Sequence, residues 1–147
     1  EQLLPGTSVK VTYQLSDEWL DIMHAVTGGP RLLSDGDIVV KQSVMEENFR
    51  GELIARNART AVGVDRFGKF IMVMVEGKKP SRRRARTGML FTELAGLMKS
   101  LGCIHAVAFD GGSSATMVIQ GRVILGASAG YQPPVSNAII VRKRRES

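Results

Sequence analysis

The chain has 147 residues, the size of one ordinary domain, and its 44% hydrophobic and 23% charged residues exclude a chain that is disordered throughout. No apolar run approaches the roughly 18 to 20 residues that cross a bilayer, and the single cysteine excludes an internal disulfide and a cysteine-rich zinc site. The net charge of +6 indicates polyanions such as phosphates, nucleic acids, anionic glycans or lipid surfaces as candidate partners.

The first part of the chain predicts short elements joined by turns. Residues 9–13 alternate apolar and polar side chains, which is typical of a half-buried strand. Ser16 suits the N-cap of a short helix, which the glycines and proline at 28–30 would end. Residues 32–40 predict two short strands around a turn, and the polar residues 43–57 predict a connection with one helical turn.

The later part of the chain predicts a long helix among hairpins. The apolar runs 61–64 and 70–75 are separated by a turn-forming insert and predict a hairpin. Residues 88–101 carry apolar side chains at helical spacing, ahead of a C-capping glycine. A buried strand at 106–109 follows, and then another hairpin over 116–125.

These elements predict the fold class. Residues 138–141 predict a closing strand before a basic tail at 142–147. Because strands dominate and do not alternate strictly with helices, we expect an α+β fold in a single domain over 1–147. Its sheet is mixed and largely antiparallel, with the helix at about 88–101 packed on it.

The positive charge is concentrated in two places. Half of the 20 basic residues lie in clusters at 78–86 and 142–145. Neither cluster contains an aromatic residue that could stack on a base. A solvated loop and a frayed tail are therefore favoured over dedicated nucleic-acid binding, and no nucleic-acid partner is expected.

The loop after strand 106–109 is the first candidate site. It combines a carboxylate, two glycines and several hydroxyl groups: Asp110, Gly111, Gly112, Ser113, Ser114 and Thr116. The glycines allow the backbone to approach a ligand and leave N–H groups for oxyanions, while the hydroxyl groups add orientable donors. A tight β-turn capped by Asp110 is an equally good interpretation.

Glu93 is the second candidate carboxylate. It lies in the first turns of the predicted helix, among residues that otherwise look buried. Taken alone, it is better explained by the favourable interaction of an acid with a helix N-terminus. Because the helix leads through a short strand straight to Asp110, the two carboxylates could share one pocket, as glycoside hydrolysis requires.

Other polar residues are candidates for phosphate contact. Arg59 and Thr60 precede an apolar strand, and a guanidinium beside a hydroxyl group suits phosphate or carboxylate, with a surface arginine at a strand edge as the alternative. His24 and Lys41 could transfer protons or contact phosphate, yet isolated residues of these types are more often structural or solvated. Cys103 is interpreted as a small core residue.

An ordered set of segments resembles the phosphodiester glycosidase family over roughly residues 28–141. The segments are 28–36, 58–65, 92–95, 109–117 and 135–138, the last of which contains Asn137. The resemblance implies hydrolysis of a sugar, such as N-acetylglucosamine, joined through its anomeric carbon to a phosphodiester. The products would be a free sugar and a phosphomonoester.

The resemblance also implies roles for the candidate residues. A phosphate leaving group needs little protonation and more anion clamping, which favours Arg59, Lys41 and the glycine turn, with Asn137 as a further substrate contact. Glu93 and Asp110 are the expected catalytic carboxylates, and which of them performs which step stays open. No cofactor is required, although Asp110 with its hydroxyl neighbours could bind a hard cation such as Ca²⁺.

The resemblance extends to location and partners. Many members are bacterial secreted or envelope proteins linked to exopolysaccharide, so the expected location is extracellular or in the cell envelope, with a phosphorylated or anionic glycan as substrate. The family's early Asn-Gly-Gly-Tyr-Phe-like motif is absent, so we expect an N-terminal segment or a second chain to complete the domain. The alternative function is a non-catalytic module that binds anionic cell-wall polysaccharide through its basic clusters.

Overall fold

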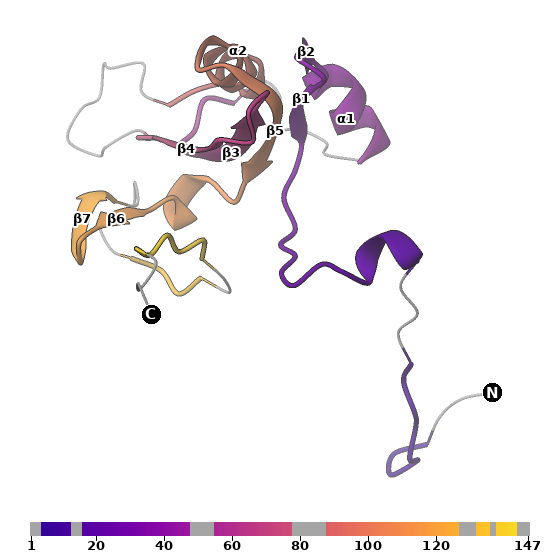
Figure 1. The fold of residues 1–147 in the computed structure, drawn as a ribbon. Coiled ribbons are helices and arrows are strands. Elements are labelled where there is room, and N and C mark those ends of the chain that lie inside the picture. Colours follow the sequence, from indigo (N-terminus) through magenta and orange to yellow (C-terminus); the bar gives the residue numbers. More distant parts are fainter. Residues whose placement is uncertain are drawn as a thin grey trace.

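The computed structural model describes residues 4–12, 16–47, 55–77, 88–126, 132–135 and 138–143. A five-stranded sheet in the order β2-β1-β5-β3-β4 forms its centre, and every neighbouring pair is antiparallel (Figure 1). The strands are β1 (Arg31–Ser34), β2 (Asp37–Ile38), β3 (Arg59–Asp65), β4 (Phe70–Val75) and β5 (Cys103–Phe109), and the α-helices are α1 (Val40–Glu46) and α2 (Phe91–Ser100). The α+β prediction is confirmed, as is the prominent helix.

The core lies between α2 and one face of the sheet, where small residues allow a close approach (Figure 1). Ala61 pairs with Ala108 across β3 and β5, and all three alanines in this part of the core, Ala61, Ala106 and Ala108, are buried. Leu94 and Met98 of α2 are 0% exposed against them. Burying each leucine- or methionine-sized side chain stabilises the fold by about 1.5 to 3 kcal/mol.

Helix α1 differs from the sequence prediction, which placed a strand up to residue 40 and only one helical turn beyond residue 43. The helix begins at Val40, and Val40 and Val44 are both buried, as the spacing of one helical turn allows. The side chain of Ser43 fixes α1 to β1, because its Oγ accepts a hydrogen bond of 2.7 Å from the Arg31 N–H and donates to Glu47. Contacts with β1 thus stabilise a helix that the pattern of polar residues did not predict.

The predicted hairpins are confirmed. β3 and β4 pair from Arg59–Val75 to Val64–Phe70. β1 and β2 turn through Asp35 and Gly36, whose φ angles are 50° and 84°, and this left-handed pair is typical of two-residue hairpin turns. A separate hairpin of β6 (Met117–Ile119) and β7 (Arg122–Leu125) forms in the region expected from the sequence.

The predictions for the chain's first and last described segments are wrong. Residues 9–12 and 138–141 form no strand, and the helix expected after Ser16 is only a 3₁₀ turn at Asp17–Trp19. Val11 is 68% exposed and Ile140 76% exposed, so these alternating patterns find no sheet to join among the described residues. Figure 1 shows the N-terminal segment running away from the sheet.

Two basic clusters can be placed only in part. Residues 78–87, which hold the first cluster, lie outside the described residues, as do residues 144–147 of the tail. Arg142 and Lys143 are exposed and have no regular structure. Among the helices that the structure describes, none has the length and apolar character needed to span a membrane.

Candidate active site

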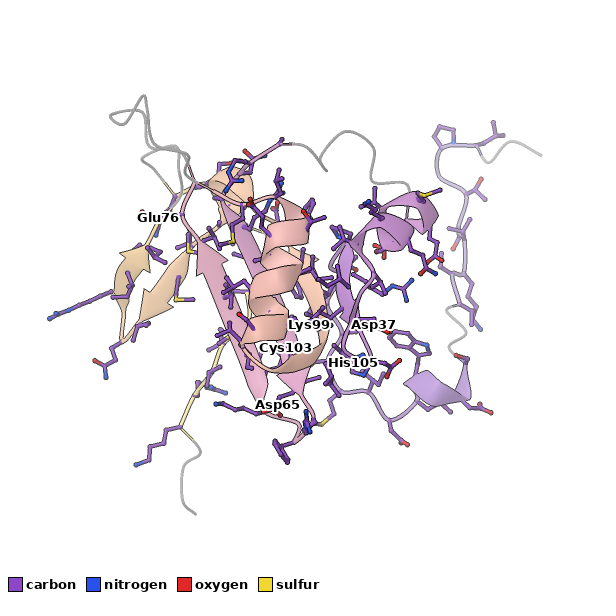
Figure 2. All side chains as sticks on the ribbon, turned by 90° about the horizontal axis from the view of Figure 1, so that it is seen from above. Asp37, Asp65, Glu76, Lys99, Cys103 and His105 are labelled. Carbon is purple, nitrogen blue, oxygen red and sulfur yellow. The ribbon has the colours of Figure 1, made fainter. Side chains whose placement is uncertain are left out.

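One end of the sheet collects most of the predicted functional residues. β3 begins there, β4 and β5 end there, and Figure 2 shows Glu76, which follows β4, at this end, while Asp65, Cys103 and His105 lie at the other. The N-terminus of α2 belongs to the same end, because Arg59 at the start of β3 stacks on Phe91 at the start of the helix. The antiparallel order of the strands therefore brings the segments of Arg59, Glu93 and Asp110 together.

Asp110 follows the last residue of β5. Thr60 on the neighbouring strand pairs with Phe109, and its Oγ1 donates a hydrogen bond of 2.5 Å to the main-chain oxygen of Asp110. The residue is exposed, and within the described ranges its carboxylate takes part in no hydrogen bond or ion pair. Asp110 thus has a fixed main chain and a carboxylate that is open to a ligand.

The glycine turn packs tightly against β3. A Cβ on Gly111 would lie 2.6 Å from the main-chain oxygen of Ala58, and the Gly112 N–H donates to that same oxygen at 2.9 Å. The Ser114 N–H donates to the oxygen of Gly111 at 3.1 Å, within a 3₁₀ turn over Gly112–Ser114. The sequence predicted that the N–H groups of this turn are left for oxyanions, but those of Gly112 and Ser114 are already used inside the fold.

This close packing makes a substitution testable. Gly111→Ala is expected to lower the free energy of unfolding by about 1 to 3 kcal/mol, because the added methyl group overlaps the Ala58 carbonyl. Gly96→Ala is the matched control: Gly96 lies in α2 with open space around its Cα, so the same change should stabilise by about 0.5 to 1 kcal/mol. Urea unfolding followed by circular dichroism measures both, and equal effects at the two positions would contradict this account.

Glu93 occupies the third position of α2 and binds the helix N-terminus. Its Oε2 accepts a hydrogen bond of 3.1 Å from the Leu90 N–H, which is half of a capping box, and its Oε1 lies 2.5 Å from Nη1 of Arg56. The interpretation of Glu93 as an acid at a helix N-terminus is confirmed. The sequence reasoning did not select Arg56, and no motif in the sequence marks it, because its importance comes only from its contact with Glu93.

Arg59 is buried rather than presented to solvent. The residue is 3% exposed, its Nε donates to the oxygen of Met89 at 3.0 Å, and Nη2 donates to the oxygen of Ala55 at 2.8 Å. Its guanidinium lies 3.8 Å from the centre of the Phe91 ring. These contacts connect the start of β3 to the start of α2, so the surface-arginine interpretation is wrong, and phosphate binding by Arg59 stays a prediction.

The remaining candidates are scattered. His24 is exposed in the irregular segment before Gly28. Lys41 is exposed on α1, which packs against β1, and in the strand order β5 separates β1 from β3 and β4. Ser113 is exposed, Ser114 and Thr116 are half-buried, and all three follow the glycine turn directly. Asn137 lies outside the described residues.

Cys103 is a core residue, as the sequence predicted. It is buried at the start of β5, and burial, with a smaller effect of the nearby Asp65 carboxylate, raises the pKa of its thiol above the usual value. A thiol with a raised pKa is a poor nucleophile at neutral pH.

The chain belongs to the phosphodiester glycosidase family, whose model matches residues 2–142. It is 29% identical over 123 residues to N-acetylglucosamine-1-phosphodiester alpha-N-acetylglucosaminidase of Mus musculus, an alignment that covers 76% of this chain and 23% of the mouse protein. The human protein of the same name is 27% identical over the same length. The chain therefore spans about a quarter of the length of these curated relatives.

Solved structures agree with this assignment. The zebrafish N-acetylglucosamine-1-phosphodiester alpha-N-acetylglucosaminidase catalytic domain, auto-inhibited by its pro-peptide, has a TM-score of 0.57 and 32% identity, covering 67% of this chain and 33% of that one. A hypothetical protein from Synechocystis has a TM-score of 0.55 and 28% identity, covering 69% of this chain and 18% of that one. Membership of this family supports a hydrolase of the glycosidase type.

Proposed function

We propose that this chain hydrolyses a sugar-1-phosphodiester, of the N-acetylglucosamine-1-phosphodiester kind, to the free sugar and a phosphomonoester. The single observation that supports this best is the exposed carboxylate of Asp110 just after β5, which has no hydrogen bond or ion pair to the described part of the chain, in a member of the phosphodiester glycosidase family. A substrate can reach the carboxylate in that position from solvent, whereas Thr60 binds the Asp110 main-chain oxygen and Ala58 binds the N–H of Gly112 two residues further on.

The proposed chemistry separates two tasks. The bond between the anomeric carbon and the phosphate oxygen breaks, and the phosphate leaves as an anion that needs little protonation. A carboxylate must then stabilise the positive charge on the sugar, attack it, or activate water. Asp110 and Glu93 are the proposed catalytic groups, with the step of each left open, and the scheme requires no metal or cofactor.

The proposed setting is an extracellular or envelope glycan that carries phosphate. The names of the mouse and zebrafish relatives specify an N-acetylglucosamine-1-phosphodiester, and we extend that substrate class to this chain. We also propose that further polypeptide, either from the same protein or from a second chain, completes the domain. The exposed side chains of Val9, Val11 and Ile140, and the 33% coverage of the zebrafish catalytic domain, support this.

The direct test is sugar release from a panel of N-acetylglucosamine-1-phosphodiesters that differ in the alcohol of the second ester group. The expected result is time-dependent release of N-acetylglucosamine and of the matching phosphomonoester in equal amounts. Release of N-acetylglucosamine-1-phosphate instead would indicate cleavage of the other ester bond and would contradict a glycosidase. A folded protein that includes the completing polypeptide and is inert on the whole panel would also contradict the proposal.

A non-catalytic module that binds anionic glycans is the second candidate function. The observation that favours it is the net charge of +6, with half of the basic residues in two short clusters. Such a module would bind anionic polysaccharide with an affinity that falls steeply with salt, and the affinity would not change in Asp110→Asn. Binding combined with absent sugar release would favour this function over the enzyme.

A further inference from the structure

We propose that Thr60 is a positioning residue, which orients Asp110 for the proposed glycosidase reaction through the hydrogen bond from its hydroxyl group to the Asp110 main-chain oxygen. This inference rests on the proposed function. It changes the role of Thr60, which the sequence alone suggested as a direct contact to substrate or phosphate.

The register of the sheet places Thr60 for this role. Thr60 pairs with Phe109, the last residue of β5, so its side chain stands beside the first residue beyond the strand. There its Oγ1 lies 2.5 Å from the Asp110 oxygen. At the end of the β3–β5 pairing, the Thr60 hydroxyl group therefore adds one side-chain hydrogen bond between the two segments.

The other hydrogen bonds that hold this segment come from the main chain. The Gly112 N–H donates to the Ala58 oxygen at 2.9 Å on one side. On the other side, the Gly29 N–H donates to the Ala108 oxygen at 2.7 Å, and the Ala108 N–H to the Pro30 oxygen at 3.1 Å. Within the described residues, the contact from Thr60 is thus the one that a side-chain substitution can remove while the backbone contacts remain.

That contact controls the direction of Asp110. The oxygen that Thr60 binds belongs to the peptide group between Asp110 and Gly111, so its orientation sets ψ of Asp110 and φ of Gly111. Glycine gives this peptide more rotational freedom than another residue would. Without the hydroxyl group, the peptide could rotate and carry the Asp110 side chain away from its orientation.

The same contact argues against a direct role in phosphate binding. A hydroxyl group has one proton to donate, and Thr60 donates it to the Asp110 oxygen. Phosphate oxygens accept hydrogen bonds and would need that proton. A phosphate ligand at Thr60 would therefore break the contact that fixes Asp110.

The test compares Thr60→Val, which keeps the shape and removes the hydroxyl group, with Thr60→Ser, which keeps the hydroxyl group. For sugar release from an N-acetylglucosamine-1-phosphodiester, we expect kcat of Thr60→Val to fall about tenfold to a hundredfold with KM unchanged, the effect of a misplaced catalytic group. Thr60→Ser should restore most of kcat. Thr12→Val, in the exposed N-terminal segment, is the matched control and should behave as the wild type.

Particular outcomes would overturn the inference. A raised KM with unchanged kcat in Thr60→Val would show that Thr60 binds substrate. A kcat that falls in Thr60→Ser but stays at the wild-type value in Thr60→Val would show that packing of the methyl group matters instead. If the wild type releases no sugar even with the completing polypeptide present, the proposed function fails, and the contact is tested by NMR. The Asp110 carbonyl and Gly111 amide resonances should then shift in Thr60→Val and hardly in Thr60→Ser, and unchanged resonances would refute the contact.

Discussion

Asp110→Asn is expected to lower kcat for sugar release by about a hundredfold to ten-thousandfold, the range that proton transfer or charge stabilisation by one positioned carboxylate supplies. The substitution keeps the size of the side chain and removes its negative charge. Because the Asp110 carboxylate is exposed and makes no hydrogen bond or ion pair with the described residues, the thermal midpoint should stay close to that of the wild type. Initial rates on an N-acetylglucosamine-1-phosphodiester, together with thermal unfolding, measure both effects.

A matched control separates the loss of one negative charge in general from the loss of the Asp110 carboxylate at the proposed active site. Asp35→Asn makes the same change in charge at an exposed turn position with φ of 50°, which asparagine tolerates, and it should keep full activity. If Asp110→Asn keeps wild-type rates, Asp110 is not catalytic and the site must be sought elsewhere. Glu93→Gln gives a less direct test, because the Glu93 carboxylate also binds the Leu90 N–H and Arg56, so a loss of activity there would mix chemistry with stability.

Local sequence signals predicted the hairpins and α2 because each is decided by neighbouring residues. Asp35-Gly36 supplies a turn wherever two short strands flank it, and the apolar spacing over 91–100 makes a helix with one buried face. The strands expected at 9–13 and 138–141 needed a partner that local pattern cannot supply, and those of their residues that the structure describes stay outside the sheet. α1 shows the reverse case, in which a helix forms where the local pattern did not predict one, because Ser43 makes hydrogen bonds with Arg31 and Glu47 that stabilise it.

For the site, sequence could identify residue types but not what each side chain contacts. The sequence indicated that the helix of Glu93 leads through one strand to the loop of Asp110, and the structure has both at the same end of the sheet, while a shared pocket stays a prediction. It could not show that the proton of the Thr60 hydroxyl is used by Asp110, or that Arg56 reaches Glu93 across 37 positions. Such contacts depend on strand register and helix placement, which the residue pattern leaves open.

Arg59→Met is expected to lower the free energy of unfolding by about 2 to 4 kcal/mol, because it removes hydrogen bonds to the oxygens of Met89 and Ala55 and the stacking on Phe91. Methionine fills a similar volume, so the loss reports the guanidinium rather than a cavity. Arg66→Met, in the exposed turn between β3 and β4, makes the same change in charge and should alter stability by less than about 0.5 kcal/mol.

Urea unfolding and the kinetics of sugar release, measured on both variants, decide whether Arg59 is structural or binds phosphate. A structural guanidinium predicts a large loss of stability, with KM of the folded protein close to that of the wild type. A phosphate ligand predicts the opposite, wild-type stability with a KM for the phosphodiester raised at least tenfold. Because the residue is 3% exposed and bound to main-chain oxygens, we expect the first result, and the second would show that substrate binding exposes a side chain that the free protein buries.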